Sequence, residues 1–314
     1  MTKIGIISDV HANPIALKKV FAQETAINEW FFLGDAVGYG PFPIEAIVLL
    51  ITHIDPDHWL IGNHDAILLN LYDDSITLPA RKTIMNQLSI LHNKGIGLYG
   101  WCKKFWTIDT ASPRSILDKS VDYWFAHGMV DDWPNCIMRY VFPFQDDDSY
   151  NDIRHAFNNL NERRRDNHST VLFCGHSHMP TFLFSPYRQN YYQYRPIHLD
   201  RENSLNETGL YVVNTGSVGF SRISKRDDRC PYAYYVVLDI SQNTFQFKRI
   251  GYEGDRLIEE SNKQNATWDR GKDGMTVRRF YEAAYMDANN KREWEKVYRE
   301  TEQGWEPIID RHNW

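Results

Sequence analysis

The sequence predicts an α/β (α+β) protein in which two mixed β-sheets pack as a sandwich flanked by helices. The first seventy residues alternate apolar runs with helical segments, which is the order of a β-α-β layer with right-handed crossovers. After Pro180 the pattern changes to short strands and turns. The 314 residues, 42% apolar and 24% charged, are enough for one large core with an appendage or for two small domains. Two sheets that face each other, with helices outside, would accommodate both halves.

The amino-terminal part begins with an isoleucine-rich run at 3–8, which is typical of a buried parallel strand. Asn13 can cap the helix expected at 13–24, and Pro14 can occupy its first turn. The other elements expected in this part are strands at 29–34 and 58–62, a helix at 41–53, and helical structure over 66–100, clearest at Ala80–Asn93.

The second half is expected to be mostly strand. The expected strands lie at 122–128, 170–176, 181–185, 190–199, 210–217, 233–240 and 244–250. A polar stretch of mixed charge at about 131–170 interrupts this pattern and is interpreted as an insertion, helical near its end. We expect one domain over residues 1–253 and an extension of helices over 254–314, packed on the body by its Trp and Tyr residues.

The net charge and the cysteines limit which partners and which cellular compartment the protein is expected to have. The net charge of −6 implies no general affinity for nucleic-acid backbones or anionic membranes. The four cysteines are scattered and form no CxxC pair, which disfavours a thiolate zinc site and a disulfide framework. The amino terminus is charged too early for a signal peptide, and no apolar run approaches the ~20 residues of a membrane span. We therefore expect a cytoplasmic protein without a membrane partner.

Side chains that bind metals follow the ends of five expected strands. They are Asp9 and His11, then Asp35, then Asn63, His64 and Asp65, then His127, and finally His176 and His178. Loops at the carboxyl ends of strands in α/β sheets form the ligand crevice. Imidazole and carboxylate ligands without sulfur suit divalent first-row metals. They are too many for one ion and suit two ions roughly 3.5–4 Å apart. One carboxylate must then lie between the cations, and Asp35 is our candidate.

Each of these residues has an ordinary alternative when it is taken alone. An Asp after a strand is usually a turn or helix cap, and a His near a strand end is more often structural than a ligand. The repeated order favours one shared site, because each strand is followed by a small residue or glycine and then by a polar side chain.

The series "DVH", "GD", "GNHD", "HG" and "GHSH" resembles the motif set of the calcineurin-like metallophosphoesterase superfamily, in the same chain order. The segment "NTGSVGFSR", Asn214 to Arg222, resembles the Asn-Pro-Gly-Ser-Val-Gly segment of its small bacterial and archaeal phosphodiesterase-like branch, with Thr215 in place of the proline. That branch includes diadenosine-polyphosphate hydrolases.

The resemblance implies two divalent metal ions, with manganese favoured and iron, zinc, nickel or cobalt as alternatives. The implied ligands are Asp9, His11 and His178 for the first ion, Asn63, His127 and His176 for the second, and Asp35 for both. His64 is implied to lie near the scissile phosphate and to donate a hydrogen bond or a proton.

The implied activity is hydrolysis of a phosphodiester or a nucleotidic pyrophosphate by in-line attack of a metal-bridging hydroxide, with His64 as general acid. Asp65 either orients His64 or caps the helix that follows it. Asn214 and Arg222 either reach the substrate or serve as a turn residue and a surface charge. Nucleic acid would be a partner only as substrate, and a homo-oligomer is left open.

The sequence disfavours two alternative functions. A phosphomonoesterase or protein phosphatase of the same superfamily is disfavoured because Ala36, Val37 and Gly38 follow "GD", where protein phosphatases have Arg-Gly. A non-catalytic metal-binding scaffold is disfavoured because the acid histidine and every implied ligand are present.

Overall fold

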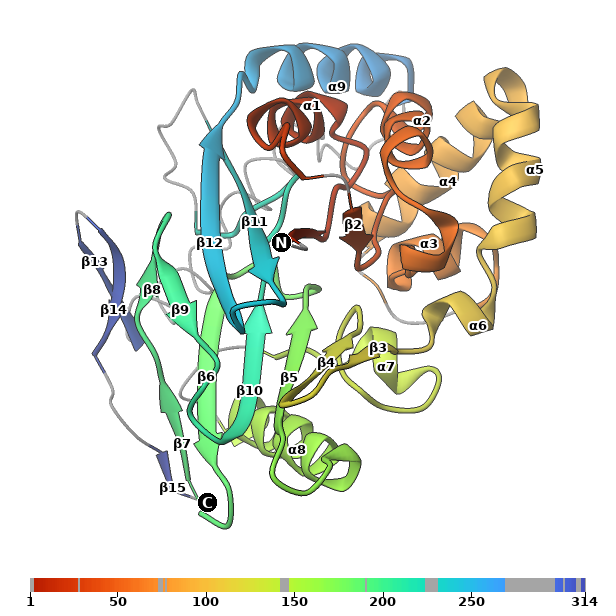
Figure 1. Cartoon of the computed structure of the whole chain (residues 1–314). Helices are drawn as coiled ribbons and strands as arrows, with labels where there is room; N and C mark the ends of the chain where they lie inside the picture. Colours follow the sequence, from red (N-terminus) through yellow and green to blue (C-terminus); the bar gives the residue numbers. More distant parts are fainter. Residues whose placement is uncertain are drawn as a thin grey trace.

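Two mixed β-sheets face each other and helices cover the outside of the sandwich, as the sequence predicted (Figure 1). A computed structural model describes the chain. The residues that it describes are 3–27, 29–72, 76, 78–141, 147–189, 191–223, 231–268, 297–301, 303–308 and 312–313.

The first sheet has the strand order β2-β1-β11-β12-β9. Its strands are β1 (Lys3–Ile7), β2 (Glu29–Phe32), β9 (Glu202–Ser204), β11 (Tyr232–Asp239) and β12 (Thr244–Gly251). β1 pairs in parallel with β2 and antiparallel with β11. The carboxyl ends of β1 and β2 therefore meet at one edge of this sheet.

The second sheet has the strand order β15-β7-β6-β10-β5-β4-β3. Its strands are β3 (Arg114–Leu117), β4 (Val121–Phe125), β5 (Ser169–Cys174), β6 (Thr181–Pro186), β7 (Tyr191–Tyr194), β10 (Gly209–Asn214) and β15 (His312–Asn313). β4, β5 and β10 are parallel neighbours, so the loops that follow them also lie at a common edge.

The core between the sheets is rich in aromatic side chains. Phe31 stacks on Phe125 with ring centroids 4.1 Å apart, and Phe173 meets Phe245 edge to face at 6.0 Å. Aromatic pairs of this kind contribute about 0.5–1.5 kcal/mol each beyond area burial. A second buried cluster lies between the first sheet and the helices that cover it. This packing fixes how the two sets of strand-end loops sit relative to each other.

Helices surround the sandwich. They are α1 (Pro14–Gln23), α2 (Pro43–His53), the 3-10 helix η1 (Pro56–His58), α3 (Asn63–Leu68), α4 (Leu78–Lys94), α5 (Ile96–Phe105), α6 (Ile108–Ala111), α7 (Asn135–Met138), α8 (Asp147–Arg163) and α9 (Asp255–Trp268). The predicted cap of the first helix is confirmed, because Asn13 Oδ1 accepts a hydrogen bond from Ala16 N at 3.1 Å and Pro14 stands in the first turn. The insertion is helical near its end, as expected, and α8 packs against β5 and β10.

The prediction of a strand at 58–62 was wrong. Only one isolated bridge forms there, between Phe32 and Trp59, although Leu60 N donates to Phe32 O at 2.8 Å. The segment is short because η1 ends at His58 and α3 begins at Asn63. Strands β3 and β9 were not predicted.

The carboxy-terminal extension is helical as expected in α9, whereas its later described residues form strands. β13 (Tyr298–Thr301) and β14 (Gly304–Pro307) make a hairpin, and β14 also pairs with β8 (Ile197–His198). Backbone pairing to an existing edge, rather than local helix propensity, decides this structure. The remainder of the extension, 269–296, lies outside the described residues.

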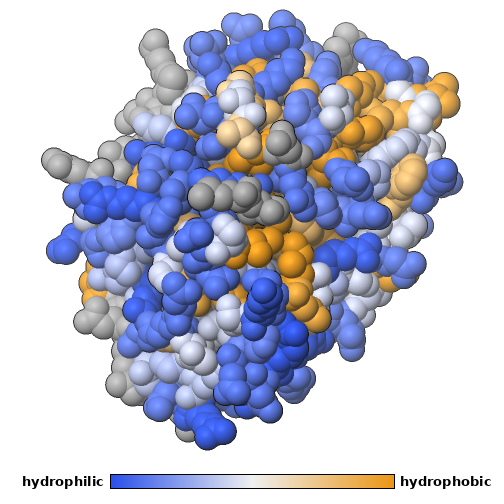
Figure 2. All heavy atoms as spheres, viewed as in Figure 1, coloured by the Kyte–Doolittle hydropathy of each residue, from blue (hydrophilic) through white to orange (hydrophobic). Residues whose placement is uncertain are grey.

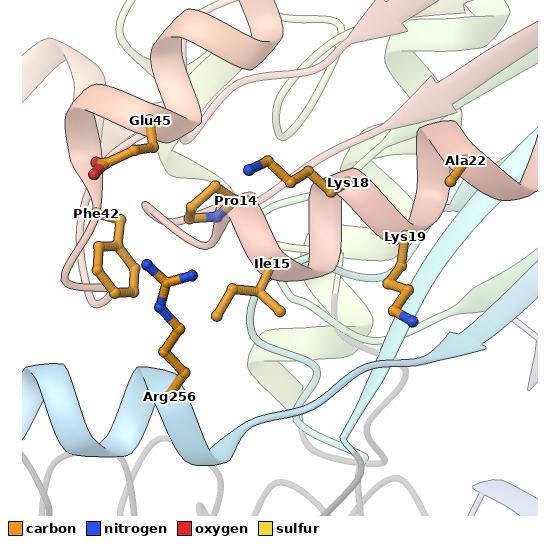
Figure 3. Close-up of a pocket in the computed structure, with 8 residues that line it drawn as sticks. All are labelled: Pro14, Ile15, Lys18, Lys19, Ala22, Phe42, Glu45 and Arg256. Carbon is orange, nitrogen blue, oxygen red and sulfur yellow. The ribbon is translucent and has the colours of Figure 1, made fainter.

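Helix α9 packs beside α1 and α2 around a cavity of about 420 Å³. Figure 3 shows the Arg256 side chain from α9 pointing toward Phe42 and Ile15. The guanidinium carbon lies 5.4 Å from the centroid of the Phe42 ring, within the range of a cation–π contact. The first part of the extension is therefore anchored to the domain body.

The face shown in Figure 2 is mostly hydrophilic, with apolar atoms gathered at upper right, where α4 and α5 lie. Met85 on α4 and Ile96 on α5 are among the exposed large apolar side chains. Within the described part of the chain, no helix is both long and apolar enough to cross a membrane.

Candidate metal centre

The loops at the strand ends bring all seven predicted metal ligands together. Asp9 and His11 follow β1, Asp35 follows β2, Asn63 begins α3, His127 follows β4, and His176 and His178 follow β5. Each of these residues is at most 4% exposed. Hydrogen bonds between loops hold the arrangement, for example Asp9 N to Gly34 O and Gly175 N to His127 O.

The first group of ligand atoms belongs to Asp9, His11, Asp35 and His178, and these atoms lie within 4.8 Å of one another. The Nε2 atoms of His11 and His178 are 3.0 Å apart. Asp9 Oδ1 is 3.3 Å from His178 Nε2, and Asp35 Oδ2 is 3.7 Å from His11 Nε2. Two carboxylates and two imidazoles thus point at one small volume.

The second group belongs to Asp35, His127 and His176 and obeys the same distance limit. His127 Nε2 lies 3.5 Å from Asp35 Oδ2 and 3.0 Å from His176 Nδ1. Asn63 Oδ1 is 3.2 Å from His127 Nε2 and adds an amide oxygen. Asp35 belongs to both groups, which is the position expected of a bridging ligand.

The nitrogen and oxygen atoms of these groups are better suited to bind divalent cations than to form hydrogen bonds with one another. Pairs of ring nitrogens face one another at 3.0 Å in both groups, and Asp9 Oδ1 is buried without a hydrogen-bond partner among the described residues. Buried polar atoms left in this way are costly unless a ligand satisfies them. Nitrogen and oxygen donors without sulfur suit first-row divalent ions.

Each of the four candidate ligand histidines is held by its second ring nitrogen, which donates to a backbone carbonyl. The bonds are His11 Nδ1 to Val37 O at 2.8 Å, His127 Nδ1 to Leu33 O at 2.9 Å, His178 Nδ1 to Phe220 O at 2.8 Å and His176 Nε2 to Met138 O at 3.2 Å. A carbonyl can only accept, so these bonds fix which nitrogen of each ring faces the centre.

The backbone of the ligand residues is unusual. Left-handed φ angles occur at Asp9 (54°), His11 (47°), Asp35 (61°), His176 (65°) and His178 (61°). Such angles are uncommon for residues with side chains and cluster at functional sites, where the surrounding structure holds them. Repeated left-handed turns let short loops aim several side chains inward.

Burial and neighbouring charges shift the pKa values of these carboxylates and histidines, and the direction differs from one histidine to another. Burial alone would raise the pKa of Asp9, but the neighbouring His178 outweighs it and the pKa is lowered. Burial would likewise lower the pKa of His127, but the Asp35 carboxylate outweighs it and raises the pKa to about 9. Burial and nearby histidines lower the pKa values of His11 and His176, which favours neutral imidazoles able to bind metal.

Comparison with known proteins agrees with this geometry. The model of the calcineurin-like phosphoesterase family matches residues 2–210, more than half of the chain. The chain belongs to the calcineurin-like phosphoesterase family. It is therefore a metal-dependent phosphoesterase, a hydrolase that acts on phosphate esters.

Two relatives illustrate the likeness. An uncharacterised protein of Methanocaldococcus jannaschii, MJ0912, is 26% identical over 266 residues, which cover 82% of this chain and 90% of the relative. The crystal structure of a metallophosphoesterase from Sphaerobacter thermophilus superposes with a TM-score of 0.57 at 22% identity, covering 84% of this chain and 94% of the other. The latter comparison shows that the fold is shared.

His64 of the phosphoesterase lies beside the first ligand group. Its ring centroid is 4.8 Å from that of His11, and its Nδ1 is buried without a hydrogen-bond partner among the described residues. A Cβ atom at Gly38 would collide with this nitrogen. Packing against Gly38 therefore holds the ring through its Nδ1 side.

Among the described residues, the Asp65 carboxylate bonds to backbone amides rather than to the His64 side chain. Its Oδ2 accepts from Asp35 N at 2.8 Å, from Ala36 N at 3.2 Å and from Gly62 N at 3.1 Å, and its Oδ1 accepts from Val37 N at 3.1 Å. The bond to Gly62 N matches the helix-cap alternative, and the others hold the loop that carries Asp35. Burial and the Asp35 charge raise the pKa of Asp65 to about 7.

Asn214 and Arg222 lie in different settings. Asn214 is fully buried, donates to Ser177 Oγ at 2.9 Å and accepts from Gly216 N at 2.9 Å, which matches the turn alternative. Arg222 is half-buried and its backbone N lies 3.5 Å from His178 O. Its positive charge counteracts the rise that burial causes in the pKa of Tyr39, so it stands near the rim of the centre.

Tyr39, Gln87 and Tyr140 complete the site and were missed by sequence reasoning. Tyr39 stands in the segment "GDAVGYGP", directly after a predicted ligand loop, and that position was an available signal. Gln87 comes from α4 and Tyr140 from the insertion. The sequence offers no period or motif that would have tied these two to the metal ligands.

Proposed function

We propose that the protein is a two-metal phosphoesterase that hydrolyses a phosphodiester or a nucleotidic pyrophosphate bond, with manganese as the favoured metal. The observation that carries the proposal is the pair of buried ligand groups that share Asp35. A single carboxylate between two cations is the arrangement expected of binuclear hydrolytic sites.

The proposed residues of the first site are Asp9, His11 and His178, and those of the second are Asn63, His127 and His176. Bound divalent cations would supply Lewis acidity and a hydroxide nucleophile near neutral pH. Asp35 would place negative charge between the two sites and reduce their mutual repulsion. The carbonyl bonds to the ligand histidines would keep the nitrogen lone pairs aimed inward without reorganisation.

His64 is the proposed general acid. Its Nε2 would hold a proton and transfer it to the departing oxygen as the phosphorus–oxygen bond breaks. Burial, chiefly, lowers the pKa of His64 below that of free imidazole, which makes its protonated form a stronger acid. The packing of the ring against Gly38 and His11 supports a fixed direction of proton transfer.

The rim of the centre supports a substrate with a planar group. Tyr39 lies next to His11 and His64, and Tyr140 lies flat on His176. Exposed parts of aromatic rings stack readily on nucleobases, and Arg222 adds a positive charge that suits phosphate. These features favour a nucleotidic ester or pyrophosphate within the proposed class.

An activity panel with added manganese tests the proposal. It compares a bis-aryl phosphodiester, an aryl phosphomonoester, diadenosine tetraphosphate, cyclic nucleotides and single-stranded DNA. We expect hydrolysis of the diester or the dinucleotide. Hydrolysis of the monoester alone would replace the proposed substrate class by that of a phosphomonoesterase.

The acid role is tested with His64→Ala. We expect this variant to keep its metal, measured by elemental analysis, and to lose at least about 100-fold in kcat, the usual contribution of a general acid. The control is His92→Ala, because His92 is an exposed residue of α4. Full activity in His64→Ala would refute the assigned role.

A further inference from the structure

Tyr39 packs against three histidines of the candidate centre. Its ring centroid lies 4.5 Å from that of His11, 4.8 Å from His64 and 6.1 Å from His178. These three histidines are at most 4% exposed, whereas Tyr39 is half-buried. The tyrosine is therefore the most exposed of these four rings.

The backbone of Tyr39 is held in a strained state. Its φ angle is 48° and lies in the left-handed region. Gly38 N donates to Gln87 Oε1 at 2.6 Å, and Gln87 Nε2 donates to Gly40 O at 2.6 Å. Both ends of one buried amide thus clamp the residues on either side of the tyrosine.

Filling the core does not require this arrangement. A tyrosine that only covered apolar surface could do so with ordinary backbone angles, whereas the left-handed region is strained for residues with side chains. Gln87 is itself only 2% exposed and uses a donor and an acceptor for the clamp. A buried polar side chain of α4, Gln87, thus serves to fix the position of the Tyr39 ring.

The ring stands on the side of the centre where His64 lies. Phe220, whose ring centroid is 5.2 Å from that of Tyr39, precedes Arg222 in the loop that meets His178. The Tyr39 ring thus lies beside His64, and the positive charge of Arg222 acts on the Tyr39 phenol. Under the proposed function, this is the side from which the leaving group departs.

We propose that Tyr39 is a substrate-contacting residue, whose ring forms the wall beside His64 and whose hydroxyl donates a hydrogen bond to an oxygen on the leaving-group side of the phosphate. Gln87 is the positioning residue that holds Tyr39 there. The inference rests on the proposed function and extends it, because it names groups that select and orient the substrate.

The first test replaces the hydroxyl alone, in the full-length protein loaded with manganese. Tyr39→Phe should lower kcat/KM about tenfold or more, the effect of losing one hydrogen bond to a charged group. Metal content and melting temperature should stay unchanged, and binding of inorganic phosphate, measured by titration calorimetry, should weaken. Tyr99→Phe, on α5, is the matched control and should behave as the native protein.

The second test is a double-mutant cycle with Gln87. If Gln87 acts through Tyr39, Gln87→Ala should lower kcat/KM, and adding Tyr39→Phe should lower it little further. Gln87→Glu keeps the acceptor for Gly38 N and loses the donor to Gly40 O, so it should show an intermediate effect. Additive losses would overturn the positioning role, since a general loss of stability would add to the effect of the phenylalanine.

The results distinguish failure of the proposed function from failure of the role inferred for Tyr39. A native enzyme that is inactive on the whole panel would overturn the proposed function and this inference with it. An active native enzyme whose Tyr39→Phe variant stays within twofold in kcat/KM, or loses metal, would overturn the inference alone.

Discussion

The ring of Tyr140 lies flat on the ring of His176, with centroids 3.7 Å apart and planes inclined by 16°. The same imidazole donates to the carbonyl of Met138, so two residues of the insertion contact one candidate ligand. The insertion is thus part of the metal centre as well as a connection between strands.

Removal of this ring should weaken one of the two metal sites. We expect Tyr140→Ala to lower manganese affinity at the His176 site by roughly 10-fold, the lower end of the effect of losing an outer-shell partner. Titration calorimetry on the metal-free protein would show one weakened and one unchanged binding event. Tyr140→Phe keeps the stacked ring and is the matched control. Equal affinities in all three proteins would contradict the structural role of the stack.

Replacement of the shared carboxylate should affect both sites. Asp35→Asn removes the negative charge that lies in both ligand groups, so each cation would lose an anionic ligand and the two cations would repel each other more strongly. We expect metal affinity at both sites to fall by more than the roughly 10–100-fold cost of an outer-shell partner. Elemental analysis after dialysis gives the measurement, with the exposed Asp57→Asn as control. Loss of only one equivalent would show that Asp35 does not serve both ions.

Asp65→Asn distinguishes the two roles left open for this residue. Asparagine has one acceptor oxygen and one NH2 donor, so the three bonds that Oδ2 accepts and the bond that Oδ1 accepts from Val37 N cannot all be kept. We expect a loss of roughly 3 kcal/mol in the free energy of unfolding, together with weaker metal binding.

Chemical denaturation of Asp65→Asn gives the first quantity and metal titration the second. If Asp65 instead acts by orienting His64, stability and metal content would be retained and only kcat would fall.

Metal binding should be linked to protons through His127. The Asp35 carboxylate outweighs burial and raises the pKa of His127 to about 9, so this ring holds a proton at pH 7 in the metal-free protein. A cation requires the neutral ring and must displace that proton. Apparent manganese affinity should therefore rise with pH between 6 and 8, by about tenfold per unit for one proton. Titrations in buffers of different ionisation enthalpy would detect the released proton, and an affinity independent of pH would contradict the linkage.

The candidate metal ligands could be predicted from the sequence because they follow the ends of recognisable strands. Apolar runs marked β1, β2, β4 and β5, and the polar residues after them were expected at one edge because parallel strands share that edge. The expected strand at 58–62 was wrong, yet Asn63 still reaches the centre, since Leu60 N bonds to Phe32 O and carries the segment along β2.

The residues and strands that were not predicted depend on tertiary contacts, which leave no pattern in the local sequence. Gln87 faces the 38–40 loop only because α4 packs there, and Tyr140 reaches His176 from an insertion of mixed polarity. The strands β13 and β14 arise from pairing with β8, while their own charged sequence resembles a helix. Tertiary pairing overrides local preference in such segments.

The two ligand groups each draw on both halves of the sandwich. Asp9 and His11 extend from the first sheet toward His178 of the second, and Asp35 extends from the first toward His127 and His176. Each bound cation would therefore cross-link the two sheets, because its ligands come from both. Metal binding would therefore stabilise the fold as well as supply the catalyst, and a chelator should lower the melting temperature. Neither sheet alone would retain a complete binding site.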